Sequence, residues 1–214
     1  MTNIFKAPEK HERKKRLFQI GIETLQKQGW SVTREKGLGK SSVRRITKNG
    51  ESKLVSIRTS QDQWIAFPPN PKGKGWVTLD VVDAVVAVSV DANVPPRDAL
   101  VHWLPADDMR KRFDRALKAR KDAKRVRPDR RVWLPLYERE SNHSDNVSYV
   151  GGGAGLDYPP VAQVRMNDGG AMRATVGDAA PSLDAGPMTI AQAKRGLALT
   201  FGVPESSIRI NVEA

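Results

Sequence analysis

An Asn-Gly pair at positions 49 and 50 lies between two segments in which apolar and polar residues alternate. Both residue types accept the positive φ angles that a two-residue turn between antiparallel strands requires. The pair therefore predicts a β-hairpin with strands over residues 42–47 and Leu54–Arg58. A short third strand is predicted over Trp64–Phe67, after a polar turn. This part of the chain is thus predicted to form a β-sheet.

Two other segments repeat their apolar residues at helical spacing. Leu17 and Leu25 recur on one side of residues 9–28, opposite the basic run HERKKR. Pro105 predicts the start of a second, basic helix, because its missing N–H is not needed in a first turn. This helix is predicted to end at Arg127-Pro128. Its predicted buried stripe is Met109, Phe113, Ala116 and Leu117.

Two apolar blocks, Val81–Val90 and Ala99–Leu104, predict further strands, the first of them buried. Strands and helices in this order favour an α/β (α+β) fold. We expect a small mixed sheet flanked by the N-terminal helix and the basic helix.

Composition divides the chain into three parts, of which the first, residues 1–140, is the predicted basic α/β domain. Residues 141–187 are rich in Gly, Pro and Ala and include the run GGGAG. They predict a linker or mobile loops, with short strands at 147–150 and 161–166 as the alternative. Residues 188–214 regain apolar periodicity and predict a C-terminal helix–strand element. The run LALTFGVPESSIRI within them also fits the middle of a helix-turn-helix.

Charge is distributed unevenly along the chain. Lys and Arg number 36 and Asp and Glu number 24, which gives a formal net charge of +12. Residues 1–140 hold 31 basic and 17 acidic side chains, whereas the remaining residues hold 5 and 7. A field of this sign favours a polyanion, because each phosphate neutralised by Lys or Arg releases counterions. A charged surface that only keeps the protein soluble is the alternative. We expect nucleic acid as the partner, with DNA favoured.

Several chemistries lack their residues in this sequence. No cysteine is present, which excludes disulfides and thiolate metal sites and fits a cytoplasmic protein. The three histidines are isolated, and no Gly-x-Ser-x-Gly motif occurs. The longest apolar run, Ala84–Val88, is far too short to cross a bilayer. We therefore expect no catalytic residue, no metal, no cofactor and no membrane partner.

Ser56-Ile57-Arg58 lies on the predicted return strand of the hairpin. The order of helix, strand, hairpin, strand, buried strand and basic helix over residues 9–127 resembles the core of the restriction-endonuclease-like, or PD-(D/E)XK, superfamily. Active members place an acid on one strand and Glu-x-Lys on the next, to hold Mg²⁺ and activate water. The resemblance implies a degenerate site, with Ser56 in the place of the acid and Arg58 in the place of the lysine. Asp80 and Asp83 are the pair best placed to rebuild a metal site.

Three functions stay open from the sequence. The first is a non-catalytic nucleic-acid-binding protein on a nuclease-like core. The second is an adaptor or accessory protein that binds a protein partner, or a second copy of itself, through residues 188–214. The third is an active metal-dependent nuclease with displaced carboxylates. The predicted phosphate-contacting and base-stacking residues are Lys40, Arg44, Arg45, Arg58, Lys72, Lys74, Trp64, Trp76, Arg110, Lys111, Arg115 and Lys118.

Overall fold

The structure is a computed structural model that describes residues 8–35, 42–71, 74–93, 96–125, 131–143, 145–166 and 209. The chain divides into two compact units, residues 1–176 and 177–214, and every element named below belongs to the first. In chain order these elements are α1 (Pro8–Lys27), β1 (Ser31–Arg34), β2 (Val43–Lys48), β3 (Glu51–Ser60), β4 (Trp64–Phe67), the 3₁₀ turn η2 (Leu79–Val81), β5 (Ala84–Val90), β6 (Asp98–Pro105), α2 (Ala106–Asp122), β7 (Val132–Pro135), the 3₁₀ turn η3 (Glu140–Asn142), α3 (Ala154–Asp157) and β8 (Ala162–Arg165).

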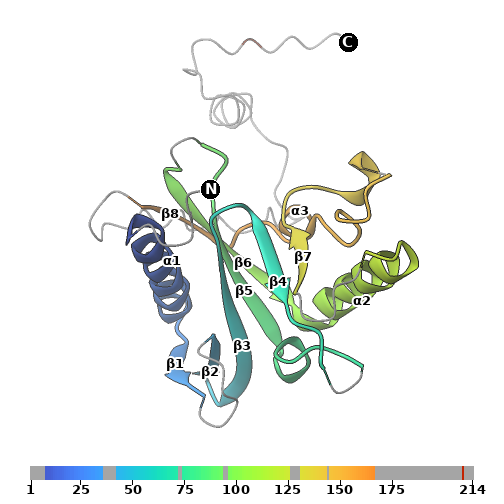
Figure 1. Cartoon of the computed structure of the whole chain (residues 1–214). Helices are drawn as coiled ribbons and strands as arrows, with labels where there is room; N and C mark the ends of the chain where they lie inside the picture. The colour runs from blue at the N-terminus through green and yellow to red at the C-terminus, as the bar shows by residue number, and fades with distance from the viewer. Residues whose placement is uncertain are drawn as a thin grey trace, which may run out of the picture. The chain divides into compact units, whose positions relative to one another are not determined.

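The main sheet has six strands in the order β1-β2-β3-β5-β6-β8 (Figure 1). Neighbouring strands are antiparallel except β3 and β5, which run parallel. The hairpin between β2 and β3 turns at Asn49, with φ 50°, and Gly50, with φ 82°, as the sequence indicates. A mixed sheet with flanking helices confirms the predicted α/β (α+β) class.

The strand β4 departs from the place beside β3 that a simple meander would give it. It pairs with β7 in a separate two-stranded sheet, with Ala66 opposite Trp133. The place next to β3 is taken by β5, all seven residues of which are buried. A strand that is apolar on both faces is stable where both faces are covered. Trp64 of β4 keeps part of its surface exposed, which the separate sheet allows.

The two faces of the main sheet are covered by different elements (Figure 1). α1 packs on one face and forms the α1-side core. At Gly21 a Cβ atom would lie 3.0 Å from Val88 and 3.1 Å from Ile57, so the glycine lets the helix approach the sheet closely. α2, β4 and β7 cover the other face and form the α2-side core, where the rings of Phe67 and Phe113 meet edge to face at 5.2 Å. No helix in the described part of the chain is long and apolar enough to span a membrane.

The described residues between 141 and 166 belong to the folded unit, which corrects the prediction of a linker over that part of the chain. β8 pairs with β6 at the edge of the main sheet, in agreement with the alternative of a strand at 161–166. Residues 147–150 form turns rather than a strand. The rest of the predicted linker and the predicted C-terminal element, apart from Arg209, lie outside the described residues.

The GGGAG run explains why composition was misleading here. A Cβ atom on Gly152 would lie 2.4 Å from the carbonyl oxygen of Glu138, closer than any side chain tolerates. The Gly153 N–H donates to the carbonyl oxygen of Pro135 at 3.0 Å. Glycine therefore serves close backbone packing in this run, whereas the prediction interpreted it as a sign of flexibility.

A buried polar network joins the main sheet to the segments after β7. His102 on β6 is fully buried, and its Nδ1–H donates to the carbonyl oxygen of Tyr158 at 2.8 Å. Since that carbonyl can only accept, His102 Nε2 accepts the hydroxyl proton of Tyr137 at 2.7 Å, and the Tyr137 oxygen accepts from Ser89 at 2.5 Å. Burial lowers the pKa of His102 and raises the pKa of Tyr137, so both are neutral at pH 7. This histidine is a structural residue rather than a free base.

Candidate functional site

The residues in the place of the nuclease acid and lysine lie two apart on β3. Val55 and Ile57 of the same strand belong to the α1-side core, so Ser56 and Arg58 face the α2 side. Ser56 is fully buried, and its Oγ has no hydrogen-bond partner among the described residues. The guanidinium of Arg58 lies 4.1 Å from the centre of the Phe67 ring. A buried hydroxyl and a guanidinium offer no carboxylate oxygen for a hard cation, so this position does not have the ligands of a Mg²⁺ site.

Arg58 is a cation without a carboxylate partner in the described part of the chain. Its Nε atom is buried and makes no hydrogen bond with a described residue. Burial lowers the pKa of Arg58 to about 10, with a smaller effect from the positive charge of Arg131. Arg58 therefore stays charged at neutral pH and lies within the field of a second guanidinium. An anion near both groups would stabilise them.

Asp80 and Asp83, the pair best placed to rebuild a metal site, each bind the backbone. Asp83 Oδ2 accepts the N–H of Leu54 at 2.7 Å and so fixes the start of β5 beside β3. Asp80 Oδ2 accepts the N–H of Trp76 at 2.6 Å. Within the described ranges, no three His, Cys, Asp or Glu side chains gather where they could hold a metal ion. The two aspartates stabilise a strand start and a loop.

The predicted phosphate-contacting residues of the hairpin are divided between the two faces of the main sheet. Arg44 lies 4.9 Å from the ring centre of Phe18 on α1, whereas Arg58 contacts the α2-side core. Arg45 is neutralised, because its Nε donates to Glu35 at 2.8 Å. These arginines therefore do not combine into the single surface that the sequence predicted. Lys40 and Lys72 lie outside the described residues.

The cations on the first three turns of α2 mostly have acidic partners. Lys111 is exposed and forms no ion pair with a described residue, whereas Arg110, Arg115 and Lys118 are paired. We call residues 107–118 the paired part of α2. Three of its ion pairs join residues one helical turn apart, and the other two reach acids on later segments. The pairs are Arg110–Asp107, Arg112–Asp108, Lys118–Asp122, Arg112–Asp157 and Arg115–Glu140.

The C-terminal end of α2 is different. The helix ends at Asp122, before the predicted Arg127-Pro128, because Lys124 takes a left-handed φ of 53°. Arg120 and Lys121 form no ion pair with any residue that the structure describes. Arg120 Nη2 donates to the carbonyl oxygen of Trp133 at 2.6 Å, while its Nη1 is buried without a hydrogen-bond partner in the described chain. Burial lowers the pKa of Arg120, which indicates a guanidinium that is poorly solvated and not neutralised.

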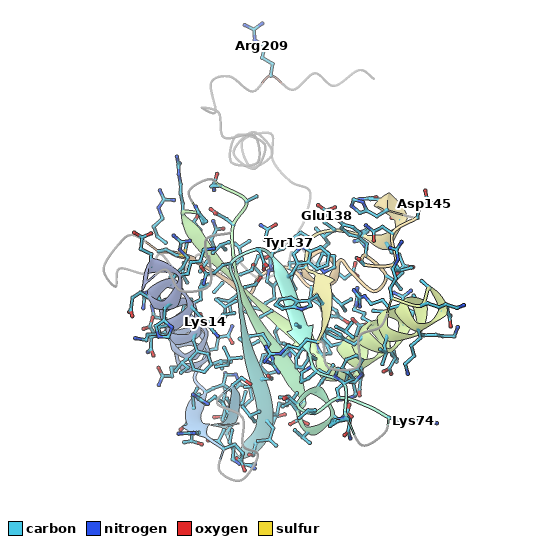
Figure 2. All side chains as sticks on the ribbon, viewed as in Figure 1. Lys14, Lys74, Tyr137, Glu138, Asp145 and Arg209 are labelled. Carbon is cyan, nitrogen blue, oxygen red and sulfur yellow. The ribbon has the colours of Figure 1, made fainter. Side chains whose placement is uncertain are left out.

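A hollow of about 1220 Å³ lies beside this helix end, between α2, the β4–β7 sheet and the loop after β4. Lys74 belongs to that loop, and its side chain extends outward from the loop backbone (Figure 2). The two acids in the wall, Asp80 and Asp114, are already bound to Trp76 through its N–H at 2.6 Å and its Nε1–H at 2.9 Å. We call this hollow the cationic pocket, after the five cations that line it: Lys74, Arg120, Lys121, Arg125 and Arg131.

Three tryptophans line the cationic pocket, but they differ in what they can offer to a ligand. Trp76 is 2% exposed and packs against Phe113, so this predicted base-stacking residue is part of the core. Trp64 is partly exposed and meets the Tyr149 ring edge to face at 5.5 Å. Trp133 is 46% exposed and presents the largest accessible aromatic surface of the three.

Comparisons of this chain with protein-family models, with curated proteins and with solved structures found no match. The resemblance to the restriction-endonuclease-like superfamily therefore stays a prediction.

Sequence reasoning named cations on the first turns of α2, most of which are ion-paired, and named neither the cations at the C-terminal end of the helix nor Trp133. A usable signal was present in the helix itself. Asp107 and Asp108 lie three or four residues before Arg110 and Arg112, the spacing at which side chains pair on a helix. Arg120 has only Ala, Leu and Lys at the corresponding spacings. This helical spacing agrees with the unpaired Arg120 but does not decide every case. Lys111 has acids at these spacings and is unpaired in the described chain, whereas Arg115 has none and pairs with Glu140. Arg131 enters the pocket only through the tertiary fold.

Proposed function

We propose that this protein binds nucleic acid through the cationic pocket and does not cleave it. The observation that carries the proposal is the gathering of five cations, from three segments, around one hollow with no acidic partner among the described residues. The dipole of α2 favours cations at its C-terminus, which accounts for Arg120 and Lys121. It does not account for Lys74 or Arg131, which come from other parts of the chain. Gathered like charges repel one another, and a polyanion would offset that repulsion.

The size of the pocket favours a polymer over a small anion. Pockets for small molecules are usually roughly 300–1,000 Å³, whereas this one is about 1220 Å³. Its cations come from three separate segments of the chain. A nucleic-acid backbone supplies one phosphate per nucleotide, and each phosphate that meets a cation adds a counterion-release contribution to the affinity.

The chemistry of β3 supports binding without cleavage. Ser56 is buried, and Arg58 has a pKa of about 10, so neither can hold a metal or act as a general base at neutral pH. Asp80 and Asp83 accept backbone N–H groups. Labelled DNA should therefore stay intact in the presence of Mg²⁺ or Mn²⁺. The other two functions, a nuclease with displaced carboxylates and an adaptor acting through residues 188–214, stay predictions.

Two lysines one turn apart on α2 provide a matched test of the proposed interface. Lys121 lines the pocket, whereas Lys118 is paired with Asp122 at 2.7 Å, and both are exposed. Lys121→Gln and Lys118→Gln remove the same charge from the same helix. We expect Lys121→Gln to flatten the dependence of log K on log salt by about 0.7–0.9, the contribution of one phosphate contact, and Lys118→Gln to leave that slope unchanged.

The measurement is fluorescence anisotropy with labelled oligonucleotides of about 12 residues, single-stranded and duplex, between about 50 and 200 mM salt. An equal loss of slope in both variants would show that net charge acts without a site. No detectable binding of either oligonucleotide at the lower salt concentration would overturn the proposed function.

A further inference from the structure

We propose that the cationic pocket also accepts an unpaired nucleobase, stacked on Trp133, so that the ligand is single-stranded nucleic acid rather than a duplex. This inference rests on the proposed function and adds the class of nucleic acid to it. It depends on three features of the pocket: the presentation of Trp133, the space beside its ring and the position of the nearest cations.

Trp133 is held in an exposed position by its strand. Its neighbours on β7, Val132 and Leu134, are buried in the α2-side core, so the alternation of the strand turns Trp133 outward. Its main chain is fixed by pairing with Ala66 and by the hydrogen bond from Arg120. A large aromatic side chain kept in water on a fixed strand is a ready stacking surface, because every base has a π-face.

The cationic pocket supplies the space beside this ring. Trp133 and Trp64 both line the hollow of about 1220 Å³. Ala66 is the residue directly opposite Trp133, and Trp64 lies two residues along β4 on the same face, diagonal to Trp133. Trp64 packs on Tyr149 and makes no ring contact with Trp133 among the described residues, so the two rings border the hollow separately.

Two cations of the pocket lie near Trp133 and would pair with the phosphates of a strand whose base is stacked there. Arg120 is hydrogen-bonded to the carbonyl oxygen of Trp133 and keeps its buried Nη1 without a partner in the described residues. Arg131 precedes Trp133 by two residues and lines the same pocket. A single strand can place a base and its phosphates in the pocket together. A duplex keeps its bases paired inside the helix, so only its phosphates reach these cations.

The experiment uses the full chain and three probes of about 12 residues: oligothymidylate, an abasic strand of the same length, and a duplex. We expect the unaltered protein to bind oligothymidylate more tightly than the other two. Trp133→Ala should weaken oligothymidylate binding by roughly 5- to 150-fold, the effect of losing one stacked base, and leave the abasic strand and the duplex almost unchanged. Trp133→Phe keeps an aromatic ring and should recover most of the affinity.

Leu156→Ala is the control, because Leu156 is a large exposed apolar residue that does not line the pocket. It should bind all three probes like the unaltered protein. If the three probes bind equally, or if Trp133→Ala weakens all of them alike, the base pocket is refuted while phosphate binding stands. If none of the probes binds at low salt, the base pocket and the proposed function fail together. Circular dichroism of each variant checks that it is folded.

Discussion

The two ends of α2 carry the same kind of side chain and use it differently. In the paired part, residues 107–118, four of the five Lys and Arg side chains are neutralised, and Arg112 reaches across to Asp157 near the end of α3. At the other end, Arg120 and Lys121 have no acidic partner among the described residues and line a hollow with exposed aromatic surface. A basic helix is therefore not one functional surface. One end is tied to the rest of the fold by ion pairs, and the other end carries the unpaired cations on which the proposed function rests.

The strongest test of this division measures both the unfolding free energy and the DNA binding of one variant from each end of α2. Arg112 is 12% exposed and donates to Asp108, to Asp157 and to the carbonyl oxygen of Gly152. Arg112→Gln leaves these acceptors without their partner, so we expect the free energy of unfolding to fall by about 2–3 kcal/mol. Lys121→Gln should change it by less than about 0.5 kcal/mol.

Urea denaturation of both variants, beside anisotropy with the same oligonucleotides, gives the two readouts. Arg112→Gln should bind DNA like the unaltered protein while it is folded, and Lys121→Gln should bind more weakly at unchanged stability. Arg112→Lys keeps the charge but not the planar fork, and should lie between Arg112→Gln and the unaltered protein in stability. If Lys121→Gln were the less stable of the two, the division of α2 would be wrong.

Much of the fold was predictable because it depends on local pattern. The helical spacing of residues 9–28 corresponds to α1, and the Asn49-Gly50 turn was specified by the φ angles that it requires. Pairing between distant segments was not predictable in this way. Nothing near Trp64 in the sequence indicates that its strand pairs with β7, and nothing in the GGGAG run indicates that the glycines let two backbones meet.

The sequence indicated which kinds of residue the candidate site contains but not which positions supply them. The excess of Lys and Arg follows from composition. Whether a given cation is free depends on acids that the fold brings near it, such as Glu35 beside Arg45 and Glu140 beside Arg115. Trp133 was missed because exposure is a tertiary property: a tryptophan between two buried residues of a strand faces outward only if nothing covers it.

Releasing a paired lysine should extend the pocket along the helix. Asp122 holds Lys118 in an exposed ion pair at 2.7 Å, and Lys118 lies one turn before Lys121. Asp122→Asn frees Lys118, so we expect the slope of log K against log salt to steepen by up to about 0.9. Stability should change by less than about 1 kcal/mol, since exposed ion pairs contribute little. Glu9→Gln on α1 makes the same change in net charge on the opposite face of the main sheet, and an equal steepening there would remove the distinction between the pocket and the rest of the surface.

The smallest expected effect is a dependence of the unfolding free energy on pH. It should involve the paired part of α2 and not the end that lines the pocket. The hydrogen bond from Arg112, with a further one from Arg139, lowers the pKa of Asp157 below its usual value of 3.8. The unfolded chain therefore takes up a proton at this carboxyl before the folded chain does, and the stabilisation is complete above about pH 5 and lost as pH falls through 3.8 and below. Asp157→Asn should lower the free energy of unfolding by about 0.5–1 kcal/mol at pH 7, because the pair is partly solvated, and by progressively less as the pH falls below 3.8.

The binding of DNA should not share this dependence on pH. Arg58 loses its charge only towards its pKa of about 10. DNA affinity should therefore be flat between about pH 5 and 8 in both proteins. A difference in unfolding free energy that persists undiminished at low pH would show that Asp157 acts through shape rather than charge, and the paired end would lose its electrostatic explanation.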